Sequence, residues 1–310
     1  MNKRKLSIVI PTHNESENIV ELHRRLLQTL SFIDIDYEII FVDDSTDDTA
    51  NQISGVIKRD INVTLIKLTR SFGQATAISA GIDFSSGDAI IMMDADLQDA
   101  PELIPDFLEQ WESGFLVVYA KRPSSGPIMY RLFARMFYKI QTIFSDTYIA
   151  ENAGEFRLID RRVADFLKLL PERGRYLRGQ TLWPGFKSCA IDIQRNHRDA
   201  GVTKYNFFRS INIAIDGLIS FSLKPLKIAI ALAITLIAMV SLIVVIWVIL
   251  HFYSPGLFSP GWLSIMVAIL GIGAMNLLVL GIIGEYIGKT YEQVQGRPRF
   301  IIDYIENRNS

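Results

Sequence analysis

The sequence reads Ala89-Ile-Ile-Met-Met-Asp94-Ala-Asp96-Leu-Gln98-Asp-Ala-Pro101, an apolar run followed by polar side chains at alternate positions. In an extended segment alternate side chains share a face, so Asp94, Asp96 and Gln98 are expected to converge just beyond a buried strand. Mg²⁺ and Mn²⁺ take such oxygen ligands, and Mg²⁺ completes its shell with water and phosphate oxygens. A solvated acidic turn at the end of a strand is the competing interpretation. Residues 83–112 hold nine Asp or Glu and no Lys or Arg, a negative charge density that favours a bound divalent cation.

Short apolar runs alternate with helical patterns through the first 120 residues. This alternation is typical of an α/β fold with a mostly parallel sheet, whose ligands bind beyond the carboxyl ends of the strands. Polar clusters fall at those ends: residues 11–15 follow the first strand, residues 43–49 the second, and Asp94 to Gln98 the fourth. The pattern predicts strands at 6–10, 37–42, 63–68, 89–93 and 116–120, and helices near 16–30, 47–59, 73–84 and 101–112.

Two long apolar segments predict a membrane hairpin near the C-terminus. Residues 228–250 and 262–284 are each 23 residues without an acidic or basic side chain, enough for a helix to cross a bilayer. The loop between them, residues 251–261, has no Lys or Arg, whereas both flanks carry them. The distribution of basic residues predicts cytoplasmic flanks, an outward-facing loop and a multi-pass protein of the cytoplasmic (inner) membrane. The flanking cations are Lys224, Lys227, Lys289, Arg297 and Arg299.

Basic amphipathic segments precede the hairpin. Residues 113–145 carry five Lys or Arg and no acid, and residues 128–144 interleave those cations with apolar side chains. This pattern predicts a helix at the membrane interface, with an ordinary surface helix as the alternative. A second such segment, residues 205–224, leads into the first span. The expected organisation is a cytoplasmic domain at 1–204, the interfacial segment at 205–224, the two spans within 225–287 and a cytoplasmic tail at 288–310.

The composition argues against several classes of protein and of binding site. A net charge of −1 over 310 residues gives no basis for nucleic-acid binding. Cys189 is the only cysteine, which rules out an intramolecular disulfide and a cysteine-rich zinc site.

Gly284 and Gly288 have the spacing that favours close packing of membrane helices, which suggests a homo-oligomer.

Several motifs follow one another along the chain: Ile10-Pro-Thr-His-Asn-Glu15, Phe41-Val-Asp-Asp-Ser-Thr-Asp-Asp-Thr49, Ser71-Phe-Gly-Gln-Ala75, Met93-Asp-Ala-Asp-Leu-Gln-Asp99, Gly154-Glu-Phe-Arg-Leu-Ile-Asp160, Arg198-Asp-Ala-Gly-Val-Thr-Lys-Tyr205 and Gly284-Glu-Tyr-Ile-Gly288. In this order they resemble the polyprenyl-phosphate glycosyltransferases of family 2, and most of all the bactoprenol glucosyltransferases, with dolichol-phosphate mannose synthases as more distant relatives. The resemblance covers nearly the whole chain, and it is the order of the motifs together with the hairpin that makes it specific.

The resemblance implies a GT-A catalytic domain that uses Mg²⁺ or Mn²⁺ to transfer a sugar from a nucleotide diphosphate to a polyprenyl phosphate. UDP-glucose and undecaprenyl phosphate are the favoured substrates, although no residue selects glucose over mannose from GDP-mannose or an amino sugar. Three positions depart from the family's usual residue: His13 for Tyr, Gln74 for Lys and Glu155 for Asp. The implied roles are nucleotide-sugar binding for Pro11, His13, Glu15, Phe41, Asp43, Asp94 and Ala95, metal binding for Asp94, Asp96 and Gln98, and acceptor-phosphate binding for Arg122, Arg131 and Arg135.

The chemistry of the acceptor points to a single inverting displacement. A phosphate monoester has a second pKa of about 6, so at neutral pH it is largely a dianion and needs little help from a general base. Asp96 and Glu155 are the candidate catalytic residues, with Glu155 as a base or an orienting carboxylate. A processive polysaccharide synthase is a rival function, but Gln180-Thr-Leu-Trp183 lacks the arginine of the Gln-x-x-Arg-Trp signature. A non-catalytic membrane scaffold is the other rival, and intact Asp94, Asp96 and Gln98 argue against it.

Overall fold

The computed structural model describes residues 3–121, 153–172, 174–193, 224–253 and 261–308. These residues divide into two compact units. The first contains residues 3–121, the described part of 153–193 and residues 297–308, and the second contains the two long helices within 224–296. The described end of the chain therefore belongs to the same unit as its beginning.

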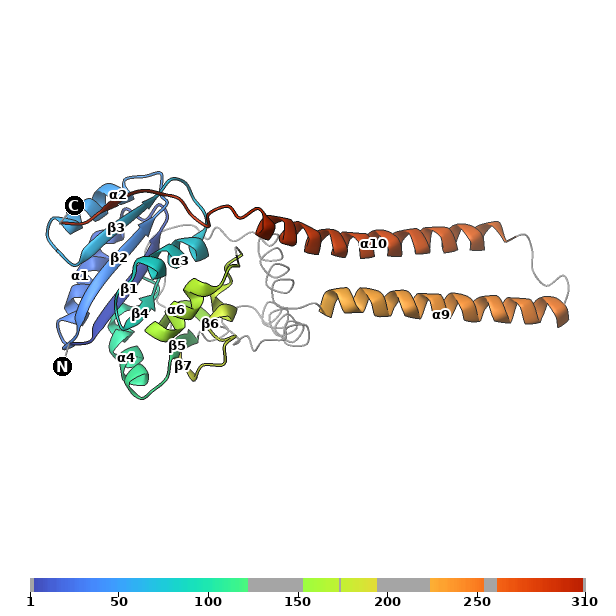
Figure 1. Cartoon of the computed structure of the whole chain (residues 1–310), viewed down its shortest axis with the longest axis horizontal. Helices are drawn as coiled ribbons and strands as arrows, with labels where there is room; N and C mark the ends of the chain where they lie inside the picture. The colour runs from blue at the N-terminus through green and yellow to red at the C-terminus, as the bar shows by residue number, and fades with distance from the viewer. Residues whose placement is uncertain (1–2, 122–152, 173, 194–223, 254–260, 309–310) are drawn as a thin grey trace. The chain divides into compact units, whose positions relative to one another are not determined.

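A mixed sheet forms the centre of the first unit (Figure 1). Its order in the described residues is β7-β5-β6-β4-β1-β2-β3-β8, and β4, β1, β2 and β3 run parallel. All five predicted strands are present, and the prediction of a mostly parallel α/β sheet is confirmed. The strands are β1 (Lys5–Thr12), β2 (Asp36–Asp43), β3 (Val63–Leu68), β4 (Ala89–Met92), β5 (Val117–Lys121), β6 (Ala153–Asp160), β7 (Ser188–Asp192) and β8 (Ile302–Glu306).

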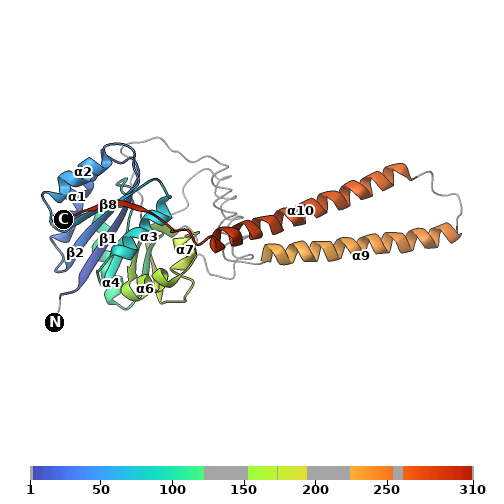
Figure 2. The same cartoon turned by 45° about the horizontal axis from the view of Figure 1, so that its top comes forward.

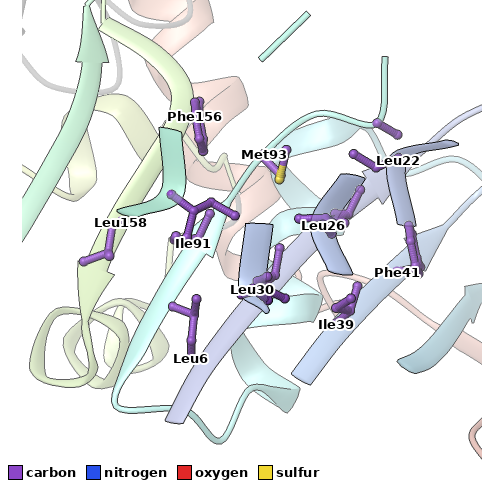
Figure 3. Packing of buried hydrophobic residues seen from close by; sticks show 14 of the residues in the cluster. Leu6, Leu22, Leu26, Leu30, Ile39, Phe41, Ile91, Met93, Phe156 and Leu158 are labelled. Atoms are coloured by element: carbon purple, nitrogen blue, oxygen red, sulfur yellow. The ribbon is translucent and has the colours of Figure 1, made fainter. Parts of the chain in front are cut away.

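Helices cover both faces of this sheet, because the strands are apolar on both faces. Apolar side chains of α1, α2 and α4 pack on one face, where Leu22, Leu26 and Phe41 meet in the larger core cluster (Figure 3). Apolar side chains of α3, α6 and α7 pack on the other face. The helices are α1 (Ile19–Leu30), α2 (Thr49–Ile57), α3 (Gln74–Phe84), α4 (Ile104–Glu112) after the 3₁₀ turn η1 (Pro101–Leu103), α6 (Arg161–Leu169) and α7 (Leu177–Gln180).

Helix α3 approaches β1 closely. A Cβ added at Gly81 would lie 2.2 Å from Val9 Cγ1, a distance that side chains do not adopt. A glycine is therefore required at this crossing. The close packing fixes α3 beside the strand whose carboxyl end begins the polar loop at residues 11–15.

The C-terminal segment differs from the predicted tail. Helix α10 (Trp262–Val294) extends beyond residue 288, and residues 302–306 then form β8, which pairs antiparallel with β3. Figure 2 shows β8 at the edge of the sheet. Without β8, strand β3 would present a row of unpaired backbone groups to solvent. Short and partly charged, Ile302-Asp-Tyr-Ile-Glu306 lacks a strong strand signal of its own, and its pairing depends on the tertiary fold.

The second unit contains α9 (Lys224–Tyr253) and α10. Within α10, Ala268–Val294 contains an 18-residue window with a mean hydropathy of 1.9, and the stretch is long and apolar enough to cross a membrane. This stretch overlaps the predicted span at 262–284. Helix α9 holds a shorter apolar stretch, Ala233–Ile243, and the predicted span at 228–250 stays a prediction.

Candidate functional site

The candidate site lies at the carboxyl ends of the parallel strands. Strand β1 lies between β2 and β4, so the chain winds outward in one direction through β2 and β3 and then returns to the other side of β1 with β4. In open α/β sheets, ligands bind beyond the carboxyl ends of the strands at such a reversal. The loops that follow β1, β2 and β4 all begin at this edge, and they carry the polar clusters predicted from the sequence.

The loop after β4 presents two carboxylates. Asp94 and Asp96 are partly exposed and Ala95 between them is buried, as the alternation predicts. Leu97 then adopts a positive φ of 58°, which ends the extended conformation. Gln98 follows this turn and is only 9% exposed, with its backbone N–H 3.2 Å from Asp96 Oδ1. The expected continuous row of three alternate side chains is thus broken after Asp96.

Asp94 and Asp96 fit a hard divalent cation that takes most of its ligands from water and substrate. Carboxylate oxygens suit Mg²⁺ and Mn²⁺, and Mg²⁺ sites that bind phosphates commonly use one or two protein carboxylates. In the part of the chain that the structure describes, no three His, Cys, Asp or Glu side chains gather as a complete metal cage. The donor set therefore suits a cation shared with a phosphate-bearing ligand rather than a structural metal.

Gln74 is the first residue of α3, and it touches the acidic pair. Its Nε2 donates to Asp94 Oδ1 at 2.5 Å. The neutral amide at this position orients the carboxylate without adding the charge that a lysine would bring. Asp94 thus has a fixed orientation from a neighbouring element.

Asp43, at the end of β2, anchors the neighbouring loops from inside. It is fully buried, and its carboxylate accepts hydrogen bonds from Thr12 Oγ1 at 2.9 Å, from the Ser45 hydroxyl and from Lys67 Nζ at 2.5 Å. Lys67 also donates to the Ser45 carbonyl at 2.6 Å. These contacts connect the ends of β1, β2 and β3. They also supply the ion pair and hydrogen bonds that a buried carboxylate requires.

The exposed groups beside Asp43 are those of the loop after β1. The ring of His13 is half exposed, and its Nδ1 lies 2.7 Å from Asp44 Oδ1, which fixes the ring over the end of β2. The Glu15 backbone N–H donates to Thr49 Oγ1 at 3.0 Å. Next to it, burial favours the neutral form of Asp47, but hydrogen bonds from Thr49 and Ser16 outweigh it and lower the pKa of that carboxyl.

Three apolar residues among those predicted to bind the nucleotide sugar have buried side chains. Phe41 is fully buried in the larger core cluster, where it packs beneath α1 and α2 (Figure 3). Its side chain therefore stabilises β2 and does not face the site, so its implied role in nucleotide-sugar binding stays a prediction that would have to rest on the backbone. Pro11 and Ala95 are also buried, so they contribute backbone shape at the strand ends.

Glu155 reaches the same edge of the sheet from a distant part of the sequence. Strand β6 pairs antiparallel with β4, and Met92 lies opposite Arg157, so Glu155 sits beside the point where the chain leaves β4. Its Oε1 accepts from Arg178 Nε at 2.6 Å, and the side chains are 20% and 38% exposed. Below them Arg157 is buried and donates to Thr181 Oγ1, to Leu177 O and to Gly154 O.

Lys67 and Arg178 are site residues that the sequence analysis missed. Lys67 gave a usable signal, because a lone cation in the apolar run 63–68 must find a partner at the strand end. Arg178 gave none, because its pairing with Glu155 depends on tertiary packing. The predicted acceptor residues Arg122, Arg131 and Arg135, the predicted interfacial helix at 128–144 and nearly all of the segment at 205–224 lie outside the described residues.

Comparisons with known proteins agree on one protein family. Residues 7–167 match the family described as Glycosyl transferase family 2. An uncharacterized glycosyltransferase of Synechocystis sp. is 42% identical over 96% of this chain and 94% of its own length. A prophage bactoprenol glucosyl transferase homolog of Escherichia coli K12 is 37% identical over 97% of this chain and 99% of its own length.

Solved structures agree on the fold. The glucosyl-3-phosphoglycerate synthase of Mycobacterium tuberculosis, in complex with Mn²⁺, uridine diphosphate and phosphoglyceric acid, superposes with a TM-score of 0.52 at 17% identity. The match covers 70% of this chain and 78% of the synthase. At this identity the likeness shows a shared fold for the sheet unit.

Proposed function

The chain belongs to glycosyltransferase family 2, and we propose that it transfers glucose from UDP-glucose to undecaprenyl phosphate or a similar polyprenyl phosphate. The observation that carries this proposal is the extent of the likeness to the bactoprenol glucosyl transferases. The family match ends at residue 167, whereas the relatives from Escherichia coli and Shigella flexneri align over 97% and 96% of this chain. The shared part therefore includes the apolar helix α10, which suits a lipid acceptor.

The donor side of the reaction is assigned to the carboxyl ends of β1 and β4. Asp94 and Asp96 would hold Mg²⁺ or Mn²⁺ together with the diphosphate, and the bound cation would offset the charge that develops on the leaving group. His13 offers an exposed ring, fixed by Asp44, on which a nucleotide base can stack. Asp43 and Lys67 shape the loop beneath that ring.

The acceptor side needs cations, because a dianionic phosphate must approach a diphosphate. We assign this role to Arg122, Arg131 and Arg135, whose guanidinium groups suit phosphate oxygens. A phosphate oxygen then forms a bond with the anomeric carbon as the bond from that carbon to the diphosphate breaks. The nucleoside diphosphate leaves with the electron pair, and the configuration at the carbon inverts. Holding both reactants in line would account for much of the rate enhancement over the uncatalysed reaction.

The topology of the fold supports a membrane hairpin. Strand β8 pairs with β3, so the described residues before and after the long helices belong to one folded unit. A folded unit lies on one side of a membrane, and the chain between its parts must then cross an even number of times. A crossing by α10 requires a second one, for which the predicted span at 228–250 within α9 is the available segment. Both flanks would be cytoplasmic, where nucleotide sugars are made.

Labelling of single cysteines tests this topology. Gly261 caps α10 at a φ of −75°, and an added Cβ there meets no atom within 4 Å, so Gly261→Cys should be tolerated. In a Cys189→Ser background, we expect an impermeant maleimide to label Gly261→Cys in intact cells. Arg308→Cys, after β8, should be labelled only after permeabilisation. Labelling of Arg308→Cys from outside would contradict the cytoplasmic assignment of the sheet unit.

A donor panel tests the activity itself. Membranes containing the protein are incubated with undecaprenyl phosphate and labelled UDP-glucose, GDP-mannose or UDP-N-acetylglucosamine, and the lipid fraction is counted. We expect label from UDP-glucose. Label from another donor alone would change the sugar but retain the reaction, and growth of a polymer would indicate a polysaccharide synthase. No transfer from any donor would favour a scaffold and overturn the proposal.

A further inference from the structure

The segment that follows α10 makes three kinds of contact with the sheet unit. Strand β8 extends the backbone ladder of β3, with Lys67 opposite Tyr304 and Leu68 opposite Ile302, and the Thr69 N–H donates to Ile301 O at 3.1 Å. The side chains of Phe300 and Ile302 pack on an apolar cluster. That cluster contains Ile40, Val42, Ile66, Leu68, Ala77 and Ala80, with Phe72 partly buried against it. The third contact is an ion pair between Arg299 and α3.

The ion pair joins Arg299 Nη2 to Asp83 Oδ2 at 3.2 Å. Both side chains are mostly buried, with 22% and 24% of their surface exposed. Burial raises the pKa of Asp83, and the charge of Arg299 acts against that shift. Removing the guanidinium would leave a mostly buried carboxylate without its strongest stabilising partner, so α3 would have to move or Asp83 would have to take up a proton.

The segment after α10 contacts β3 and α3, and these two elements contain the residues that orient the side chains of the donor site. Strand β3 supplies Lys67, which binds Asp43 and the Ser45 carbonyl. Helix α3 begins with Gln74, which binds Asp94, and Asp83 lies near the other end of the same helix. A shift of α3 along its axis would therefore displace Gln74 and release the orientation of Asp94.

We propose that residues 297–306 are a positioning element for the nucleotide-sugar site, with Arg299 acting through α3 and Gln74 on Asp94. The inference rests on the proposed function, since it concerns the donor of that reaction. It assigns to the segment after the membrane helix a role in donor binding beyond capping the edge of the sheet. Arg299 itself is a positioning residue and touches no reactant in this assignment.

The test compares Arg299→Ala with Arg299→Lys and Arg24→Ala in the full-length protein. Arg24 forms an exposed ion pair with Glu21 on α1, so its replacement makes the same chemical change away from the site. We expect Arg299→Ala to raise the KM for UDP-glucose about tenfold, a coupling of ordinary size, and to leave the KM for polyprenyl phosphate unchanged. Arg299→Lys should recover part of the loss because it keeps the charge, and Arg24→Ala should behave as wild type.

A second variant keeps the test decisive if Arg299→Ala folds poorly. Asp83→Asn removes the charge of the partner with little change in shape, and we expect it to offset part of the Arg299→Ala defect in the double variant. Thermal unfolding and binding of UDP, measured directly, accompany each kinetic assay. An active Arg299→Ala with an unchanged donor KM, or with equal rises in both KM values, would overturn this inference alone. A wild-type protein that binds no nucleotide would overturn the proposed function together with it.

Discussion

Asp96→Asn is expected to reduce sugar transfer by about 100- to 1,000-fold, the usual cost of removing one preorganised electrostatic group from a transition state. The replacement is nearly isosteric, and its amide oxygen can still accept from the Gln98 N–H, as Asp96 Oδ1 does at 3.2 Å. Only the negative charge is lost. Because Asp96 lies in a partly exposed loop, the melting temperature should stay close to that of the wild type. Label transferred from UDP-glucose to the lipid fraction is the measurement.

Asp106→Asn is the matched control, since Asp106 is exposed in the first turn of α4 within the same acidic region. It should leave transfer unchanged. Chelation of divalent cations should reproduce the Asp96→Asn defect in the wild type, and added Mg²⁺ or Mn²⁺ should reverse it. Undiminished transfer in metal-free buffer would remove the cation from the assignment and leave Asp96 with a different role.

The elements that the sequence predicted are those with strong local patterns. The five predicted strands, such as 37–42 and 63–68, are apolar runs bounded by polar turns, and their parallel winding follows from the helices between them. Strands β6, β7 and β8 were missed because their identity as strands depends on partners distant in sequence. β8 pairs with β3 across more than two hundred residues, a relation that no local pattern records.

The candidate site, like the fold, was predictable from the sequence only where it depends on local patterns. Asp94 and Asp96 were found because alternation after a buried strand is a local property. The break at Leu97 was not, because a positive φ at a leucine has no sequence signal. Phe41 was assigned to the site from the resemblance, although its alternation with Ile39 on one face of β2 places it in the core. A motif identifies the strand end, and the pleat decides which of its side chains face the ligand.

The role of Glu155 can be separated from that of a general base by its partner. Arg178 Nε donates to Glu155 Oε1 at 2.6 Å, so the carboxylate is already engaged in a charge-assisted hydrogen bond. An acceptor phosphate that is a dianion at neutral pH has no proton to give up. A free carboxylate beside it would repel it. We therefore propose that the pair acts as a charge-balanced platform, in which Arg178 offsets the charge of Glu155 near the incoming phosphate.

Arg178→Ala should accordingly be the more damaging of the two single changes. We expect it to lower kcat/KM for polyprenyl phosphate roughly ten- to a hundred-fold, the range for a hydrogen bond to a charged group. Glu155→Gln should cost less, because its amide oxygen can still accept from Arg178. The double variant Arg178→Ala/Glu155→Gln should recover part of the activity lost in Arg178→Ala, since the unbalanced carboxylate is gone.

A general base predicts the opposite order. Loss of a base typically costs about 100- to 10,000-fold, so Glu155→Gln would then be the severe change and the double variant would be no better. The pH profile gives a second measurement, since a base would impose an acidic limb on kcat that disappears in Glu155→Gln. In the charge-balancing role that limb follows the second ionisation of the acceptor phosphate and persists in the variant. The activity of Glu155→Gln relative to Arg178→Ala, at saturating UDP-glucose, thus distinguishes a general base from a charge-balancing partner of Arg178.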